Sequence, residues 1–241
     1  MKKNPTLQKK EEIVYPESDG KPIAETDLHR DLLLQSIEVF KRYFPDSYVS
    51  GNIFLYYEKD NPRRSISPDV LLALGEKPGR KRVYKTWESA PLDLVIELTS
   101  ISTKSEDYKS KKEIYSKILK VPNYIIYDPE RLILDVFMLK EDHYEQLEAD
   151  ERNLYYLAHL NIFVAQDDKV SLRFFDSYGK PVLTQEERIE LESQKAKEEF
   201  IRAEDESKRA EKESQQRISA EKRIKELEAL LNKRDTKDDL N

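Results

Sequence analysis

The chain has 241 residues, of which 38% are hydrophobic and 37% charged, and its net charge is −6. It contains no cysteine, which excludes a disulfide framework and a thiolate metal site. No apolar run approaches the 18 residues that a membrane span needs, so we expect no membrane-spanning segment. The first residues lack the apolar stretch of a signal peptide, and we expect a cytoplasmic protein.

Charge and length together predict three segments. Residues 1–15 form a charged lead-in, residues 16–183 are long enough for one folded domain, and residues 184–241 are rich in charge and lack glycine and proline. Residues 1–183 and residues 184–241 each carry a net charge near −3. A nucleic-acid binder usually has a basic surplus, so any such contact must come from local basic patches.

The first predicted element is a helix. Thr26 or Asp27 suits the N-cap, apolar residues recur at helical spacing from Leu28 to Phe44, and Pro45 ends the pattern. Next, β-branched and aromatic residues at 49–57 predict a strand. Two short apolar runs, 70–74 and 92–98, predict buried strands, and the basic stretch between them, 76–87, reads as a loop.

A second helix should follow at Thr103, because Thr103-Lys104-Ser105-Glu106 fits a capping box. Residues 123–128 predict a strand closed by Pro129, residues 131–139 predict another, and residues 142–183 predict further antiparallel strands that include 170–175. Strands that alternate with a crossover helix favour an α/β fold with a mixed sheet.

The last segment reads as a long helix, either a coiled coil or a single solvated helix held by Glu–Lys pairs. Its apolar residues fall on a seven-residue spacing that Arg217 interrupts, and Leu227, Leu230 and Leu231 mark the expected contact zone. We therefore expect a homodimer or other self-association through residues 184–241. The spaced residues are Ile189, Ala196, Ala203, Ala210, Ile224 and Leu231.

Two acids stand where acids are unusual. Asp69 opens one apolar run and Glu97 follows Leu94, Val95 and Ile96 in the other. A carboxylate at a buried strand end must be paired, hydrogen-bonded or bound to a metal. Hard cations such as Mg²⁺ or Mn²⁺ prefer oxygen ligands, and one or two carboxylates suffice. The sequence thus predicts a divalent-metal site on Asp69 and Glu97, although Asp69 also suits the end of a turn.

Asp107, Lys111 and Tyr115 follow at a spacing of four and should share one face of the second helix. If this helix starts beside the end of the Glu97 strand, Lys111 can lean toward the carboxylates and stabilise a developing charge. The ordinary alternative is an exposed helix pair and a core tyrosine.

Other residues have weaker functional interpretations. His29 is a candidate for the metal shell or a phosphate contact, although ordinary packing on the first helix is the favoured interpretation. Glu25 is a candidate auxiliary carboxylate. The loop between the two acid-bearing strands is a candidate for phosphate contacts, with a solvated loop as the alternative. Its basic residues are Lys77, Arg80, Lys81, Arg82 and Lys85.

The order of these segments resembles the PD-(D/E)xK nuclease superfamily, and more closely its Uma family of restriction endonucleases, over roughly residues 15–180. The matching motifs are Asp27-Leu28-His29-Arg30, Ser67-Pro68-Asp69-Val70, Asp93-Leu94-Val95-Ile96-Glu97-Leu98-Thr99-Ser100, Asp107-x-x-x-Lys111-x-x-x-Tyr115 and Asn123-Tyr124-Ile125-Ile126-Tyr127-Asp128-Pro129. The resemblance implies a restriction-endonuclease-like core with Asp69 and Glu97 as metal ligands. Its usual lysine, two residues after the acid, is Thr99 here, and Lys111 matches a lysine moved to the next helix, with Lys109 and Lys112 as neighbours.

These observations predict a metal-dependent DNA endonuclease, with Asp69, Glu97 and Lys111 as catalytic residues and Tyr115 and Asp107 in support. One alternative is a catalytically degenerate nuclease-fold protein that binds or scaffolds partners through its C-terminal helix. A second is a coiled-coil protein with an unrelated globular head.

Overall fold

A computed structural model describes residues 13–17, 26–100, 103–167 and 171–238, with side chains as far as residue 228. The chain divides into two compact units, residues 1–185 and residues 186–241, which we call the head and the tail. Glu25 lies outside the described residues. The elements are α1 (Asp27–Tyr43), β1 (Tyr48–Ser50), β2 (Leu55–Tyr56), β3 (Ser65–Ile66), β4 (Val70–Ala73), β5 (Tyr84–Lys85), β6 (Leu94–Leu98), η1 (Glu106–Lys111), η2 (Ile114–Ile118), β7 (Asn123–Asp128), β8 (Ile133–Lys140), β9 (His143–Gln146), β10 (Tyr155–Leu157), β11 (Ile162–Gln166), β12 (Leu172–Phe175) and α2 (Gln185–Asp238).

Helix α1 confirms the first predicted helix. Its N-cap is Thr26, whose hydroxyl accepts a hydrogen bond from the His29 backbone N–H at 3.1 Å. The helix ends at Tyr43, two residues before Pro45, and buries an apolar stripe against the sheet.

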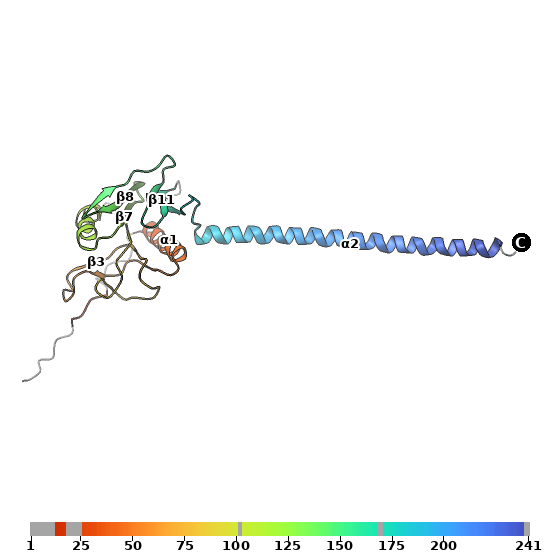
Figure 1. The fold of residues 1–241 in the computed structure, drawn as a ribbon, viewed down its shortest axis with the longest axis horizontal. Helices are drawn as coiled ribbons and strands as arrows, with labels where there is room; N and C mark the ends of the chain where they lie inside the picture. Colours follow the sequence, from red (N-terminus) through yellow and green to blue (C-terminus); the bar gives the residue numbers. More distant parts are fainter. Residues whose placement is uncertain (1–12, 18–25, 101–102, 168–170, 239–241) are drawn as a thin grey trace, which may run out of the picture. The chain divides into compact units, whose positions relative to one another are not determined.

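A six-stranded mixed sheet organises the head, in the order β1-β4-β6-β7-β8-β9 (Figure 1). Strands β6 and β7 are parallel and the other neighbours are antiparallel. The predicted α/β class, with a mixed sheet and a long C-terminal helix, is confirmed. Two three-stranded sheets complete the head, β10-β11-β12 and β3-β2-β5.

Two strand predictions were wrong in detail. The single strand expected at 49–57 is broken into β1 and β2, which belong to different sheets, because Asn52 takes a positive φ of 50° and the chain turns there. The loop expected at 76–87 contains β5, which pairs with β2 in parallel. The pairings of β2 with β3 and β5 leave no local signal, since each involves only two residues per strand.

Both faces of the main sheet are covered by apolar side chains. One cluster includes Phe40 of α1, Ile96 of β6 and Phe174 of β12. The other includes Val95 of β6, Tyr115 of η2 and Tyr124 of β7. Because side chains alternate along a strand, β6 and β7 are buried on both sides, as their continuous apolar runs predicted.

The helical segment after β6 differs from the regular helix that was expected. It begins near Thr103, but its two main stretches, η1 and η2, are π-helical. The hydroxyl of Thr103 accepts from the Ser100 backbone N–H at 3.0 Å, so it fixes the turn that leaves β6. Wide helical turns of this kind are rare and occur frequently at functional sites.

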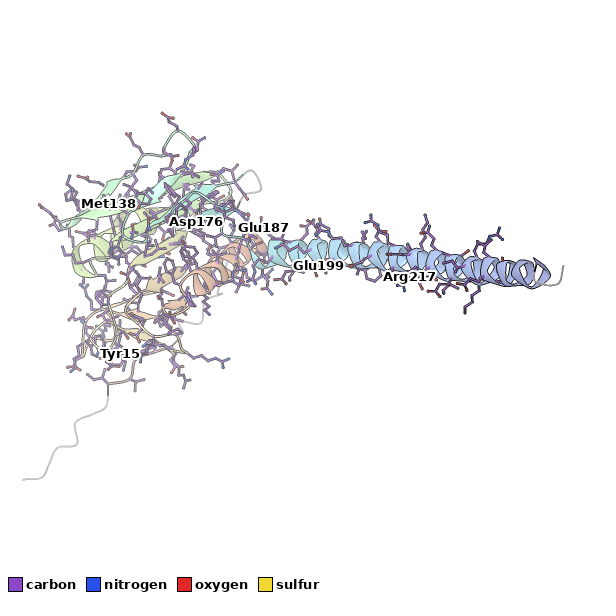
Figure 2. The ribbon with its side chains drawn as sticks, turned by 45° about the vertical axis from the view of Figure 1, so that its right-hand side comes forward. Tyr15, Met138, Asp176, Glu187, Glu199 and Arg217 are labelled. Carbon is purple, nitrogen blue, oxygen red and sulfur yellow. The ribbon has the colours of Figure 1, made fainter. Side chains whose placement is uncertain are left out.

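The tail is one helix of 54 residues, α2, as predicted from its composition. Figure 2 shows side chains such as Glu199 and Arg217 projecting along its length. Ion pairs one turn apart, such as Lys208–Glu204 at 2.6 Å, support the helix. Among the described residues, no helix of this protein is long and apolar enough to cross a membrane.

Candidate active site

The two unusual acids lie side by side on neighbouring strands. Strands β4 and β6 are antiparallel with Val70 opposite Ile96, so Asp69 and Glu97 occupy the next pair along the ladder and face the same side of the sheet. The Leu98 backbone N–H donates to Asp69 Oδ2 at 2.7 Å, which ties the two strand ends together. The backbone thus fixes the Asp69 carboxylate beside Glu97.

The η1–η2 segment covers this side of the sheet and brings two side chains, Lys111 and Tyr115, into contact with Glu97. Lys111 Nζ lies 2.9 Å from Glu97 Oε2 and 2.9 Å from Asp107 Oδ1. The Tyr115 hydroxyl donates to Glu97 Oε1 at 2.7 Å. The structure therefore brings together Asp69, Glu97, Asp107, Lys111 and Tyr115, and each oxygen of Glu97 already has one protein donor.

Burial sets the electrostatics of this cluster. The Glu97 side chain has 0% of its surface exposed and that of Lys111 has 14%. Burial raises the pKa of Glu97 to about 8, the neighbouring charges of Asp69 and Asp107 reinforce the rise, and Lys111 opposes it. Burial alone would lower the pKa of Lys111, but the attraction of Glu97 and Asp107 outweighs it and the pKa is raised.

The charges of the cluster explain why the pKa values of both Glu97 and Lys111 are raised. Three carboxyl groups, those of Asp69, Glu97 and Asp107, surround a single lysine. If all were ionised, the cluster would carry two surplus negative charges in a site with little water. Glu97, the most buried of the three, therefore tends to keep a proton while Lys111 keeps its charge.

Two further predicted residues lie at the edge of the cluster. His29 Nε2 of α1 lies 3.4 Å from Asp69 Oδ1, with 13% of the histidine side chain exposed. Thr99 is buried and directly follows β6, two residues after Glu97. Its hydroxyl lies 3.4 Å from Thr103 Oγ1.

Sequence reasoning missed two residues that support the site. A Cβ on Gly51 would lie 1.9 Å from the backbone oxygen of Asp69, so only glycine allows the two chains to approach this closely. The Tyr124 hydroxyl donates to the backbone oxygen of Asp107 at 2.9 Å and holds the start of η1 against β7. A glycine inside the strand predicted at 49–57 was the local signal for the first contact, because such a glycine often marks a close approach of two backbones.

The basic loop is largely neutralised by neighbouring acids. Lys81 pairs with Glu76 at 3.0 Å, Arg82 with Glu17 at 2.7 Å, and Lys85 with Glu88 at 3.4 Å. Lys77 and Arg80 are exposed, and no acid of the described residues pairs with either. To contact a phosphate, Lys81, Arg82 and Lys85 would first have to break these ion pairs, whereas Lys77 and Arg80 would not.

Comparison with known families places this arrangement in context. Residues 5–160, more than half of the chain, match the Uma2 family, which is described as "Putative restriction endonuclease". The chain belongs to the Uma2 family. No curated protein matches the sequence significantly. The family match and the mixed sheet agree on a restriction-endonuclease-like fold, and the Uma2 description supports a nuclease in broad terms.

Restriction-endonuclease-like families usually use divalent metals. Within the described parts of the Uma2 head, no group of three or more His, Cys, Asp or Glu side chains forms a ready-made metal cage. Mg²⁺ does not need such a cage, because it keeps several waters and binds through one or two carboxylates. The paired carboxylates of Asp69 and Glu97 fit this demand, and the surplus negative charge of the cluster fits a divalent cation.

Proposed function

We propose that the Uma2 head is a metal-dependent endonuclease that hydrolyses DNA phosphodiester bonds, with Mg²⁺ or Mn²⁺ held by Asp69 and Glu97. The observation that carries this proposal is the convergence of two strand-end carboxylates and a buried lysine, Lys111, on one side of the sheet. A divalent cation bound there would lower the pKa of water and neutralise charge on the leaving oxygen.

The side chains of the cluster have distinct proposed roles. The Leu98 backbone N–H fixes Asp69 through Oδ2, while Asp69 Oδ1 lies 3.4 Å from His29 Nε2 and is the oxygen proposed to bind the metal. Tyr115 orients Glu97, because its hydroxyl donates to one carboxylate oxygen and both side chains are fully buried and held by packing. Lys111 is a permanent positive charge next to Glu97, suited to stabilising negative charge on the scissile phosphate.

Cleavage of supercoiled plasmid DNA in Mn²⁺ tests the proposal. The wild type should nick or linearise the plasmid, and Asp69→Asn and Glu97→Gln should each lose at least about a hundredfold in rate, which is the typical cost of removing an electrostatic group. Glu106→Gln, an exposed acid on η1, is the matched control and should cut like the wild type. Equal cleavage by wild type and both site variants would show that the site does not carry the activity.

A second candidate is a catalytically degenerate nuclease-fold protein that binds or scaffolds partners. Two observations favour it: both oxygens of Glu97 are occupied by Tyr115 and Lys111, and Thr99 stands where the superfamily has its lysine. Calorimetric titration of the full chain with Mn²⁺ separates the candidates. A nuclease should release heat at one site that Asp69→Asn removes, whereas the degenerate protein should give no site-dependent heat.

A further inference from the structure

Apolar side chains on the tail are exposed along α2. Ile224 is 55% exposed and Leu227 is 46% exposed, although both are large hydrophobic residues. Farther toward the head, Phe200 and Ile201 are 70% and 57% exposed. Isolated exposed hydrophobic residues are normal on a protein surface, whereas a continuous stripe of them marks a binding site.

The region around Ile224 and the region around Phe200 differ in the spacing of their apolar residues. Ala220, Ile224, Leu227 and Leu231 follow steps of four, three and four residues, which is the alternation of a coiled-coil seam, with Ile224 and Leu231 at a and Ala220 and Leu227 at d. Phe200 and Ile201 fall outside this seam, at the neighbouring e and f positions.

The same register fails nearer the head. Continued toward the N-terminus, it places Arg217, three alanines and Ile189 at a, and a glutamate at every d position before Ala220. Two parallel copies in register would bring like charges face to face in four successive layers and bury them, which disfavours pairing there. The d-position glutamates are Glu192, Glu199, Glu206 and Glu213.

Charge also selects an orientation for two copies. In a parallel pair, a g residue meets the e residue five positions later on the other helix, so Arg223 meets Glu228. In an antiparallel pair, e residues face e residues, and Glu221 would approach Glu228. Opposite charges across a seam favour the first arrangement and like charges disfavour the second.

We propose that residues 220–231 of α2 bind the same segment of a second copy as a short parallel coiled coil, while residues 185–213 remain unpaired single helices. The unpaired stretch is a helical spacer of about 40 Å at 1.5 Å per residue. This inference goes beyond the proposed function and is independent of it, because it uses only residues of the tail and is tested without nuclease activity.

The absence of cysteine makes a direct test available. Single-cysteine variants of the full chain, Ala220→Cys inside the paired segment and Glu199→Cys in the spacer, each occupy a d position. Under mild oxidation Ala220→Cys should form a disulfide-linked dimer at least about ten times faster than Glu199→Cys, because pairing raises the effective concentration of the two thiols. In an antiparallel pair, Ala220 would face an a position, and the d–d disulfide would not form.

Sedimentation of the unmodified full chain provides the second measurement. At about 100 μM the wild type should be dimeric, since a dimer with a dissociation constant of a few micromolar is mostly formed at that concentration. Leu227→Lys should be monomeric. Phe200→Lys, an exposed hydrophobic residue off the seam, should remain dimeric. A wild-type monomer, or equal cross-linking at positions 199 and 220, would overturn the proposal.

Discussion

Replacing Lys111 by methionine is the sharpest test that the cluster exists as described. Methionine keeps the apolar stem but removes the charge that lies 2.9 Å from both Glu97 and Asp107. The two carboxylates are 0% and 2% exposed, so water cannot replace the lost partner. Removing one partner of a buried pair costs about 3–5 kcal/mol. We expect the lower end of that range near neutral pH, because protonation of Glu97 relieves part of the charge.

Urea unfolding followed by tryptophan fluorescence measures this loss. Trp87 is the only tryptophan and lies in the head, so its signal does not depend on the long tail helix. Lys109→Met is the matched control on η1: Lys109 is exposed and forms no ion pair with the described residues, so its replacement should change the free energy of unfolding by less than about 0.5 kcal/mol.

The double variant Glu97→Gln/Lys111→Met completes a thermodynamic cycle. Because Glu97→Gln removes a carboxylate that Lys111 neutralises, its cost and that of Lys111→Met should not add, and the coupling energy should exceed about 1 kcal/mol. A Lys111→Met loss as small as that of Lys109→Met, with additive single effects, would refute the buried ion pair and with it the proposed site.

Three further predictions follow from the same contacts. Gly51→Ala should destabilise the head by more than about 2 kcal/mol, since its Cβ would lie 1.9 Å from the Asp69 backbone oxygen, whereas Gly79→Ala, with no atom within 4 Å, should be neutral in the same urea assay. Tyr115→Phe should cost about 1–3 kcal/mol, because it leaves one oxygen of Glu97 without a donor; an unchanged unfolding midpoint would contradict this. Burial raises the pKa of Glu97 from 4.5 to about 8, so the native state holds a proton that the unfolded chain has lost; this contribution is full below about pH 4.5 and is lost as the pH rises through about 8. The wild type should therefore lose stability over that window and Glu97→Gln should lose less, as measured by unfolding at a series of pH values.

Much of the fold could be predicted because it depends on local patterns. The cap at Thr26 and the stop at Pro45 bound α1 to within two residues, and the run 123–128 coincides with β7. The long charged segment is one helix, as its lack of glycine and proline indicated. The breaks between β1 and β2 and the presence of β5 could not be predicted, because two-residue strands are defined by partners distant in the sequence.

The candidate site, like the fold, contains features that the sequence predicted and features that it could not. Asp69 and Glu97 could be singled out from the sequence because a carboxylate in an apolar run contradicts the pattern around it. The i, i+4 spacing likewise grouped Asp107 with Lys111. Which oxygen each donor binds, and the protonation that follows, depend on burial and on strand register, which no short window of sequence contains.

By itself, the sequence determined which residues carry charge into an apolar environment and where the helices begin and end, because both are properties of neighbours in the chain. Only the tertiary structure decided that Gly51 passes against the backbone of Asp69, that Glu17 pairs with Arg82, and that Lys111 lies against Glu97. These contacts join segments apart in the chain, and the buried Lys111–Glu97 pair gains strength because the sheet and the η1–η2 segment exclude water from it.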